Sequence, residues 1–157
     1  MKQIPLTQGK FALVDDADYE YLSQWKWRYI SGYAVRWDDS RPGRERGLIS
    51  MHREVMHAPD GMQVDHINGN GLDNRRENLR ICTHAQNMQN TGKHASNTSG
   101  FKGVFLDKTC KSKTWRAQIR IPGHRISLGS FTDPESAARA YDAKARELHG
   151  EFANTNF

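Results

Sequence analysis

The chain has 157 residues, a formal net charge of +5 and 36% hydrophobic residues, which fits one domain or a few very small ones, none with a large core of its own. No apolar run approaches the roughly 20 residues that span a bilayer, and the first residues lack the apolar stretch of a signal peptide. Cys82 and Cys110 do not form a CxxC pair, so we expect neither a disulfide framework nor a zinc knuckle, and we expect an intracellular, cytoplasmic location.

Residues 1–48 are predicted to be a small N-terminal β-rich region. The segments 10–14 (KFALV) and 32–37 (GYAVRW) mix β-branched and aromatic residues between turn signals, a pattern typical of strands. Residues 15–25 favour one short helix. The charged segment 38–47 contains Pro and Gly and is expected at the tip of a hairpin.

Residues 49–90 are predicted to form a second, central unit. At 48–57 (LISMHREVMH) the apolar residues recur near helical spacing, which predicts a short helix. Residues 64–67 then favour a strand, a loop rich in Gly and Asn follows, and 78–82 favour a second strand. A helix is predicted to begin after Thr83, so the order is strand, loop, strand, helix.

Three polar residues of this unit have types that suit phosphodiester chemistry. A carboxylate on a strand (Asp65) and an amide on the next helix (Asn87) offer the oxygen ligands that Mg²⁺ prefers. A neutral imidazole beside them (His66) suits the deprotonation of water. Because neighbouring strand residues point to opposite faces, Asp65 and His66 meet at one site only if the strand is irregular or twisted there. The same residue types are common in turns, so a structural loop stays an alternative.

The segment 64–90 (VDHINGNGLDNRRENLRICTHAQNMQN), with MHR at 51–53 before it, resembles the HNH nuclease motif. That motif is a ββα-metal fold, and the resemblance is to the form found in phage and intron homing endonucleases. The matching features are the DHI triplet, a later Asn followed by Leu and Arg, and a second Asn nine residues further on.

The resemblance implies a role for four residues. Asp65 and Asn87 would be the metal ligands, His66 the general base, and Asn78 the catalytic-site asparagine that pins the loop between the strands. The implied cofactor is Mg²⁺ or another divalent cation such as Mn²⁺, and the implied products carry a 5′-phosphate and a 3′-hydroxyl. Some relatives bind the cation with a histidine at a later position, where this chain has Thr91, which favours oxygen ligands over a zinc-type site.

Arginines flank this motif and are candidate contacts for DNA phosphates. They are Arg53, Arg75 and Arg76. For Arg53 an ion pair with a nearby acidic residue is an equally open interpretation, and for Arg75 and Arg76 the alternative is a solvated side chain without a partner in DNA.

Residues 91–98 are small and polar and are predicted to be a linker. Residues 99–157 hold ten basic and six acidic side chains, and a basic region with interleaved aromatic residues suggests nucleic acid. Three strands are expected within 101–107, 114–121 and 124–131, followed by an Ala-rich helix over 132–150. Thr132 or Asp133 is the expected cap of this helix, and Gly150 lies just past its end. Its expected apolar stripe consists of Ala137, Ala138, Tyr141, Ala145 and Leu148. The predicted fold of this module is a three-stranded antiparallel sheet packed on one helix.

Residues 99–157 resemble the APETALA2/ethylene-response-factor DNA-binding domain. The matching pieces are FKGV, WRAQIR, LGSF, AARAYD and ANTNF. Phe105 and Ser127 differ from the residues that relatives often have at these positions. We therefore do not expect this chain to share the DNA target sequence of the plant relatives. The DNA-contacting positions implied by the resemblance are Lys102, Gln118, Arg120 and Arg125, and strand alternation adds Arg116 to the same face.

These features predict an α+β protein that acts as a metal-dependent DNA endonuclease. We expect a strand-nicking, homing-type hydrolase, monomeric with a dimer left open, whose partner is double-stranded DNA. The alternative is a sequence-specific DNA-binding regulator with an inactive nuclease core. RNA binding is less favoured, because no exposed aromatic pair on the expected sheet resembles a base-stacking platform.

Overall fold

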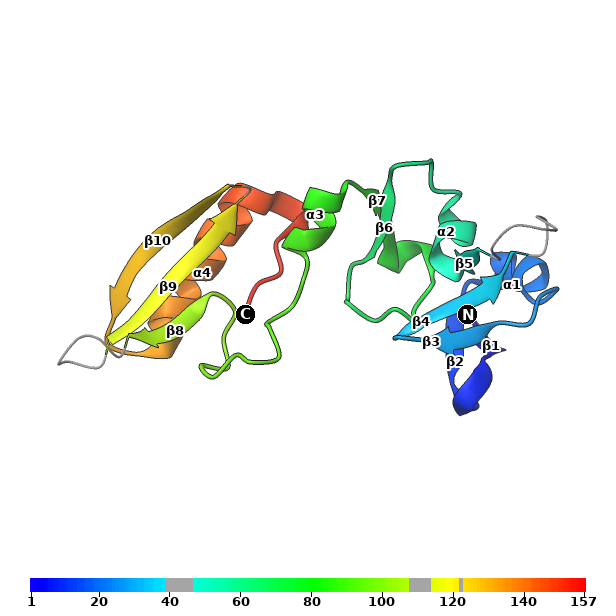
Figure 1. Cartoon of the computed structure of the whole chain (residues 1–157), viewed down its shortest axis with the longest axis horizontal. Coiled ribbons are helices and arrows are strands. Elements are labelled where there is room, and N and C mark those ends of the chain that lie inside the picture. The colour runs from blue at the N-terminus through cyan, green and yellow to red at the C-terminus, as the bar shows by residue number, and fades with distance from the viewer. Residues whose placement is uncertain (39–46, 108–113, 122) are drawn as a thin grey trace. The chain divides into compact units, whose positions relative to one another are not determined.

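The computed structural model describes residues 1–38, 47–107, 114–121 and 123–157 (Figure 1). It confirms the predicted α+β fold: small antiparallel sheets are joined by short helices, and a three-stranded sheet packs on one helix in the C-terminal part. The chain divides into two compact units, Met1–His84 and Ala85–Phe157. None of the described helices has the length and hydrophobicity needed to cross a bilayer.

Within its described residues, the first unit contains three small sheets and the two α-helices α1 and α2. The strands pair as β1–β2, as β3–β4–β5 and as β6–β7. The elements are β1 (Lys2–Pro5), β2 (Phe11–Val14), α1 (Asp16–Leu22), β3 (Arg28–Ile30), β4 (Tyr33–Trp37), β5 (Leu48–Ser50), α2 (Met51–Met56), β6 (Gln63–His66) and β7 (Leu79–Cys82), with 3-10 turns at Thr7–Gly9 and Arg76–Asn78.

One hydrophobic core holds the first unit together. It joins residues of the N-terminal β-rich region with residues of the central segment. Its buried members are Ile4, Leu6, Ala12, Val14, Leu22, Trp27, Ala34, Met51, Val55, Val64 and Leu79. Residues 1–48 and the segment that follows therefore share apolar burial, which is the main favourable term in folding.

The helix predicted over 48–57 is shorter than expected. Residues Leu48–Ser50 form β5, which pairs with β4, and the helix α2 covers only Met51–Met56. Pairing with an available strand edge stabilises the extended backbone there, and helical periodicity alone does not detect it. The predicted hairpin tip at 38–47 lies mostly outside the described residues, but its ends are joined by a hydrogen bond from Asp38 N to Gly47 O of 2.9 Å.

The second unit is the predicted sheet on a helix. The strands β8 (Val104–Asp107), β9 (Thr114–Ile121) and β10 (His124–Phe131) pair in the order β10–β9–β8. The helix α4 (Pro134–His149) packs on one face of this sheet (Figure 1). The short helix α3 (His84–Gln89) begins where predicted, and a 3-10 turn at Gly150–Phe152 follows α4.

The sequence signals at the ends of α4 act as predicted. Asp133 is the N-cap and its side chain accepts a hydrogen bond of 2.7 Å from Ser136 N, which satisfies a backbone donor that the helix leaves open. Within the predicted apolar stripe the alanines and Tyr141 are buried, whereas Leu148 is 38% exposed. Leu148 lies in the last turn of α4, beyond the part of the helix that the sheet covers.

Candidate active site

His66 ends the strand β6 in a regular ladder. The two strands pair antiparallel with Asp65 opposite Arg80 and His66 opposite Leu79. The local irregularity that would turn Asp65 and His66 toward one side is absent from this fully described strand pair. Both side chains are nevertheless buried, each with 5% of its surface exposed, so other parts of the chain cover both faces of this two-stranded ribbon.

Polar and aromatic groups, rather than hydrocarbon alone, surround the His66 ring. The His52 ring meets it edge-on, with 5.0 Å between centroids, and the Tyr33 ring lies 5.8 Å from it. Tyr33 also contacts His52 edge-on at 5.6 Å. On the loop side, His66 Nε2 lies 3.4 Å from Asn74 Oδ1. The imidazole is therefore held between two rings and one amide.

Burial sets the protonation of these two imidazoles. It lowers the pKa of His66, against a smaller upward effect from the Asn74 contact and from the Asp65 and Asp73 charges. It lowers the pKa of His52 to about 4, with the neighbouring His66 and Arg53 acting in the same direction. Both rings are therefore neutral at pH 7, and a neutral imidazole has the lone pair that a general base needs.

The buried Asn78 side chain joins the two ends of the loop between β6 and β7. Its Oδ1 accepts a hydrogen bond of 3.0 Å from Asn68 N, and its Nδ2 donates one of 2.8 Å to Asp73 O. A side chain that satisfies backbone groups on both sides of a loop restricts the conformations open to that loop. The geometry is of the kind expected of a residue that pins this loop.

The two residues implied as metal ligands lie in different units. Asp65 is in the first unit, where Arg80 donates to its Oδ2 from Nε at 2.8 Å and from Nη2 at 2.7 Å. Asn87 is on α3, in the part that belongs to the second unit. A carboxylate with an amide is a hard-oxygen donor set that fits Mg²⁺ or Mn²⁺. The described residues hold no cluster of three or more His, Cys, Asp or Glu side chains, and the implied pair contains only one such side chain.

The arginines near the motif have partners within the protein. Arg53 donates to the carbonyls of Met62, Ala58 and Pro59, at 2.6, 3.2 and 3.3 Å. These bonds fix the chain after α2. The interpretation of Arg53 as a phosphate contact stays a prediction, and the structure supplies a structural role for the same side chain.

Arg75 and Arg76 each form a bidentate ion pair with a carboxylate. Arg75 contacts both carboxylate oxygens of Asp73 at 2.7 Å and also pairs with Glu77. Arg76 contacts both carboxylate oxygens of Asp18 at 2.8 and 2.7 Å. The fork geometry suits carboxylates as well as phosphates. The Arg75 contacts lie within the loop, and the Arg76 contact anchors the loop to the N-terminal region. Their predicted role in DNA binding is untested.

Two of the cations predicted on the C-terminal sheet also have protein partners. Arg116 Nε lies 2.8 Å from Asp107 Oδ2. Lys102 Nζ donates to Gln89 O at 2.9 Å, and burial lowers the pKa of Lys102 to about 8. Both contacts hold these side chains close to the protein, where DNA would have to compete for them.

Arg120 and Arg125 differ from the other predicted DNA contacts. They lie directly opposite each other on β9 and β10. Neither side chain has a hydrogen bond or ion pair within the described parts of the chain. Like charges facing each other across two strands destabilise a sheet, so this pair is unfavourable unless an anion lies between the guanidinium groups.

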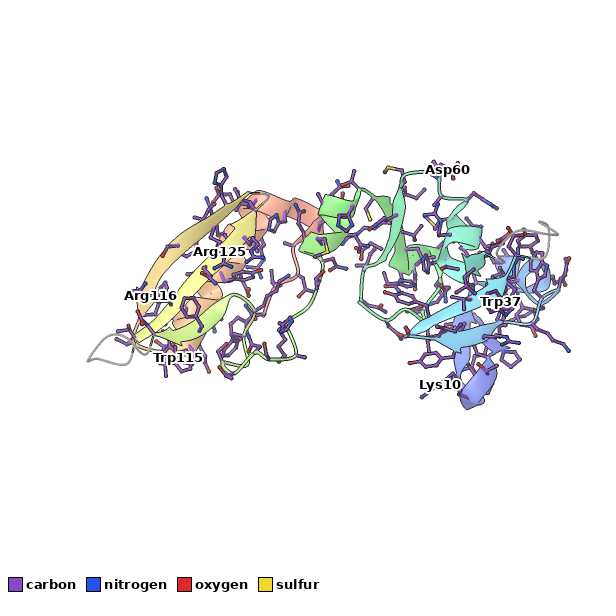
Figure 2. All side chains as sticks on the ribbon, in the orientation of Figure 1. Lys10, Trp37, Asp60, Trp115, Arg116 and Arg125 are labelled. Carbon is purple, nitrogen blue, oxygen red and sulfur yellow. The ribbon has the colours of Figure 1, made fainter. Side chains whose placement is uncertain are left out.

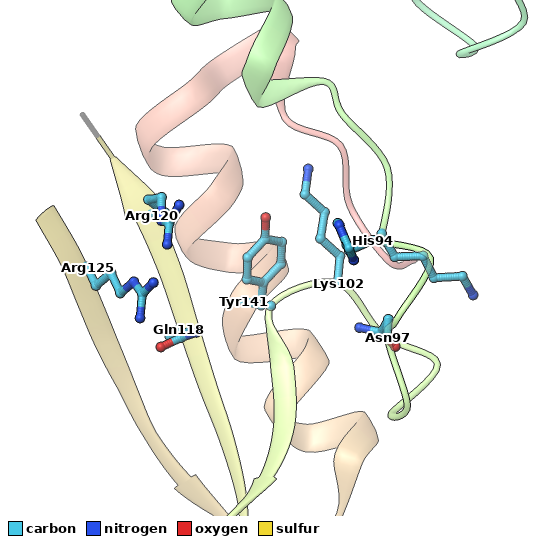
Figure 3. A pocket seen from close by; sticks show the side chains of 9 residues that line it. His94, Asn97, Lys102, Gln118, Arg120, Arg125 and Tyr141 are labelled. Atoms are coloured by element: carbon cyan, nitrogen blue, oxygen red, sulfur yellow. The ribbon is translucent and has the colours of Figure 1, made fainter. Parts of the chain in front are cut away.

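A cavity of about 340 Å³ opens beside this arginine pair. Figure 3 shows Arg120 and Gln118 on β9 and Arg125 on β10. Lys102 and His94 lie on the segment between α3 and β8, and Tyr141 lies on α4. Arg116 extends from β9 and Arg125 from β10 (Figure 2). Four of the side chains that line the cavity are cationic, namely Lys93, Lys102, Arg120 and Arg125, so the cavity suits an anionic ligand.

Three residues around His66 were not predicted to belong to the site. They are Tyr33, His52 and Asn74. His52 lies in the MHR piece upstream of the motif, which is a weak signal for it. Tyr33 and Asn74 have no signal in sequence, because the contacts that bring them to His66 are made only by the folded N-terminal region and by the loop.

Comparisons with known proteins agree with both sequence resemblances. A family model described as HNH endonuclease matches residues 57–89. The chain is 32% identical over 151 residues to an HNH endonuclease of Acanthamoeba polyphaga mimivirus, covering 95% of this chain and 76% of that protein. It is 37% identical over 95 residues to Protein 3.8 of Escherichia phage T7, covering 60% of this chain and 76% of the phage protein.

The C-terminal part is similar to plant transcription factors. The chain is 44% identical over 68 residues to the ethylene-responsive transcription factor ERF017 of Arabidopsis thaliana, covering 42% of this chain and 35% of the plant protein. No solved structure matches the chain. The segment matched by the family model holds the buried imidazole at the end of a strand, the pinned loop and the second strand, and the comparisons identify the protein as a nuclease enzyme of the HNH type. The chain belongs to the HNH endonuclease family, and DNA is its substrate or partner.

Proposed function

We propose that this protein is a metal-dependent DNA endonuclease that nicks one strand of a duplex and is targeted by its C-terminal unit. The observation that carries the proposal is the environment of His66. Burial makes the imidazole neutral, Tyr33 and His52 fix its ring, and the loop that follows it is tied down by Asn78. A preorganised neutral base costs little reorganisation at the moment of reaction.

Hydrolysis by this site requires a proton to leave water. One nitrogen of neutral His66 accepts that proton, and the water oxygen attacks phosphorus. The bond from phosphorus to the 3′ oxygen breaks, and that oxygen takes a proton from solvent. The products carry a 5′-phosphate and a 3′-hydroxyl. Because one such site cuts one strand, a monomer acting once on a duplex leaves a nick.

Asp65 and Asn87 would hold the divalent cation, Mg²⁺ or Mn²⁺, through a carboxylate and an amide oxygen. The chemistry supplied by such an ion is polarisation of the scissile phosphate and neutralisation of the charge on the departing oxygen. Arg80 pairs with Asp65 and fixes the carboxylate in one orientation. Asn78 would act on the reaction through the loop, by keeping His66 and its neighbours in place.

The C-terminal sheet is proposed to bind DNA through Arg120, Arg125 and Gln118. The opposed arginines and the basic cavity beside them support this. Arginine suits guanine, glutamine suits adenine, and either can contact phosphates. In this arrangement the bound sheet raises the local concentration of DNA at the nuclease unit. A homing role in a phage or mobile element is the biological setting we propose.

A plasmid-nicking assay tests the proposal. With Mg²⁺ the wild-type protein should convert supercoiled plasmid to the nicked form, and with EDTA it should not. His66→Ala should lower the nicking rate by about 100-fold or more, the usual effect of losing a general base. DNA affinity, measured by fluorescence anisotropy, should stay within about twofold.

A second histidine serves as the matched control. His57 is exposed and has a left-handed backbone, with φ of 47°, so Asn is a suitable replacement because it tolerates that conformation. His57→Asn should nick at the wild-type rate. Equal nicking by His66→Ala and wild type would remove His66 from its role, and binding without any nicking would favour the DNA-binding regulator instead.

A further inference from the structure

The N-terminal region holds the loop between β6 and β7 from outside. Leu13 on β2 donates to Leu72 O at 2.8 Å and accepts from Asn74 N at 2.8 Å. The loop also lies against the turn before β4: a Cβ atom on Gly71 would be 2.5 Å from Gly32 O and 2.7 Å from the Tyr33 ring. The backbone of Asn74 is therefore fixed by contacts that lie outside the matched segment 57–89.

The Asn74 side chain is fully buried and only half satisfied. Its exposed fraction is 0%, and its Oδ1 faces His66 Nε2 at 3.4 Å. Its Nδ2 has no hydrogen-bond partner among the residues that the structure describes. A buried donor without a partner costs roughly 1–3 kcal/mol, whereas an apolar side chain of the same shape would avoid that cost. Such an exception in a native fold calls for an explanation, and a bound water or a role in catalysis supplies one.

The chemistry of an amide oxygen fixes what His66 must present to it. An amide oxygen accepts hydrogen bonds and does not donate them. The nitrogen that faces it must therefore carry the proton, and in a neutral imidazole the other nitrogen then has the lone pair. The edge-on His52 ring and the Tyr33 ring limit rotation of the imidazole away from this contact.

We propose that Asn74 is a positioning residue that selects the tautomer of His66, with the proton on Nε2, so that Nδ1 is the atom that takes the proton from water. This inference rests on the proposed function of His66 as the base. Asn74 acts only through His66 and touches neither DNA nor the reacting water. The partner on the second nitrogen of a base commonly decides which ring atom is reactive.

The tautomer of His66 is measurable without any activity. In the full-length, metal-free protein, labelled with ¹⁵N on histidine and kept at pH 8, long-range ¹H–¹⁵N correlation spectra separate the two tautomers. The His66 signals are assigned by their loss in His66→Ala. We expect the wild type to show the Nε2–H form, and Asn74→Leu, which keeps the size and removes the oxygen, to lose that preference.

Kinetics separate positioning from a general effect on the fold. In the plasmid assay Asn74→Leu should lower kcat by about 10- to 100-fold, the range seen when a partner that orients a catalytic group is lost, with KM for DNA within about twofold. Asn74→Asp keeps an acceptor oxygen and should recover the Nε2–H form and part of kcat. His57→Asn, which changes an exposed side chain outside the loop, is the control and should leave the His66 tautomer unchanged.

The outcomes distinguish this inference from the proposed function. An Nε2–H form that depends on Asn74, in a protein that does not nick DNA, supports the positioning role and removes the nuclease role. Normal nicking with an Nδ1–H form in the wild type overturns the inference, because Asn74 would then donate through Nδ2. An unchanged tautomer and kcat in Asn74→Leu also overturn it. If Asn74→Leu does not fold, the wild-type tautomer and Asn74→Asp still decide.

Discussion

At the scale of single residues, His52 couples the stability of the first unit to pH. Its ring is packed against His66 and Tyr33, and its buried Nδ1 has no hydrogen-bond partner in the described parts of the chain. Burial holds its pKa at about 4, compared with 6.5 for an exposed histidine. Between these values the unfolded chain binds a proton that the folded protein does not bind.

The first prediction follows from this difference. The free energy of unfolding should fall as pH drops from about 6.5 toward 4, because protonation favours the unfolded state, and His52 should account for about 1–2 kcal/mol of the loss at pH 5. His52→Phe keeps a ring of similar size and removes the titration. Urea unfolding at pH 7.5 and pH 5, followed by tryptophan fluorescence, should show a smaller pH effect in this variant.

Carboxylates with lowered pKa values titrate below the pH range of this measurement. The lowered pKa values of Asp73 and Asp133 arise from hydrogen bonds to Arg75 and to Ser136, and the stability that they contribute is lost only below about pH 4. An identical loss of stability in wild type and His52→Phe between pH 7.5 and pH 5 would show that His52 does not carry the effect.

At the scale of structural elements, the loop between β6 and β7 depends on close packing at Gly71. This glycine has no unusual backbone conformation, and what it requires is space: a Cβ atom would overlap Gly32 O and the Tyr33 ring. The loop holds Asn74 and Asn78, so a small displacement there changes what surrounds His66.

The second prediction is that Gly71→Ala destabilises the first unit by about 1–3 kcal/mol, the usual effect of adding an atom to a packed site, and that it lowers the nicking rate at saturating DNA. Gly92→Ala is the matched control, because a Cβ atom on Gly92 has no heavy atom within 4 Å. Urea unfolding and plasmid nicking measure the two effects. A Gly71→Ala protein as stable and active as wild type would contradict the packing argument.

At the scale of the whole molecule, the two units differ in charge. The first unit has twelve basic and twelve acidic side chains, and the second has eleven and six. The entire formal net charge of +5 thus belongs to the second unit. Because phosphate contacts supply most of the nonspecific affinity for DNA, a neutral nuclease unit gains from its connection to a basic one.

The third prediction concerns DNA binding by the second unit. Replacing Arg120 and Arg125 together with Gln should weaken DNA binding and reduce the salt dependence of log K by roughly one to two units of slope. Nicking at saturating DNA should stay near the wild-type rate. Fluorescence anisotropy over a series of salt concentrations gives both the affinity and the slope.

A control with the same loss of charge places the effect on the sheet. Arg139 and Lys144 lie on α4, which covers the other face of the sheet from Arg120. Changing both of them to Gln should alter DNA affinity much less than changing the arginine pair. Equal weakening by the two double variants would mean that net charge, and not this sheet face, determines binding.

Local patterns in the sequence determined most of the elements. Alternation over 114–121, the Asp133 cap and the strand–loop–strand order around His66 each depend on neighbours in the chain, and the structure has these elements where they were predicted. The resemblance to the HNH motif indicated the family, which the comparisons support. Such patterns can be recognised in the sequence because they arise from interactions between residues that are only a few positions apart.

Tertiary structure decided what lies around the candidate site. Strand pairing with β4 made Leu48–Ser50 extended, although its spacing is helical. The guanidinium group of Arg53 donates to the Met62 carbonyl in the segment after α2, and that of Arg76 pairs with Asp18 in the N-terminal region. Tyr33 and Asn74 reached His66 from separate segments. Each of these contacts joins residues that are distant in the chain or held by a loop, so their formation depends on the packed core and not on any local pattern.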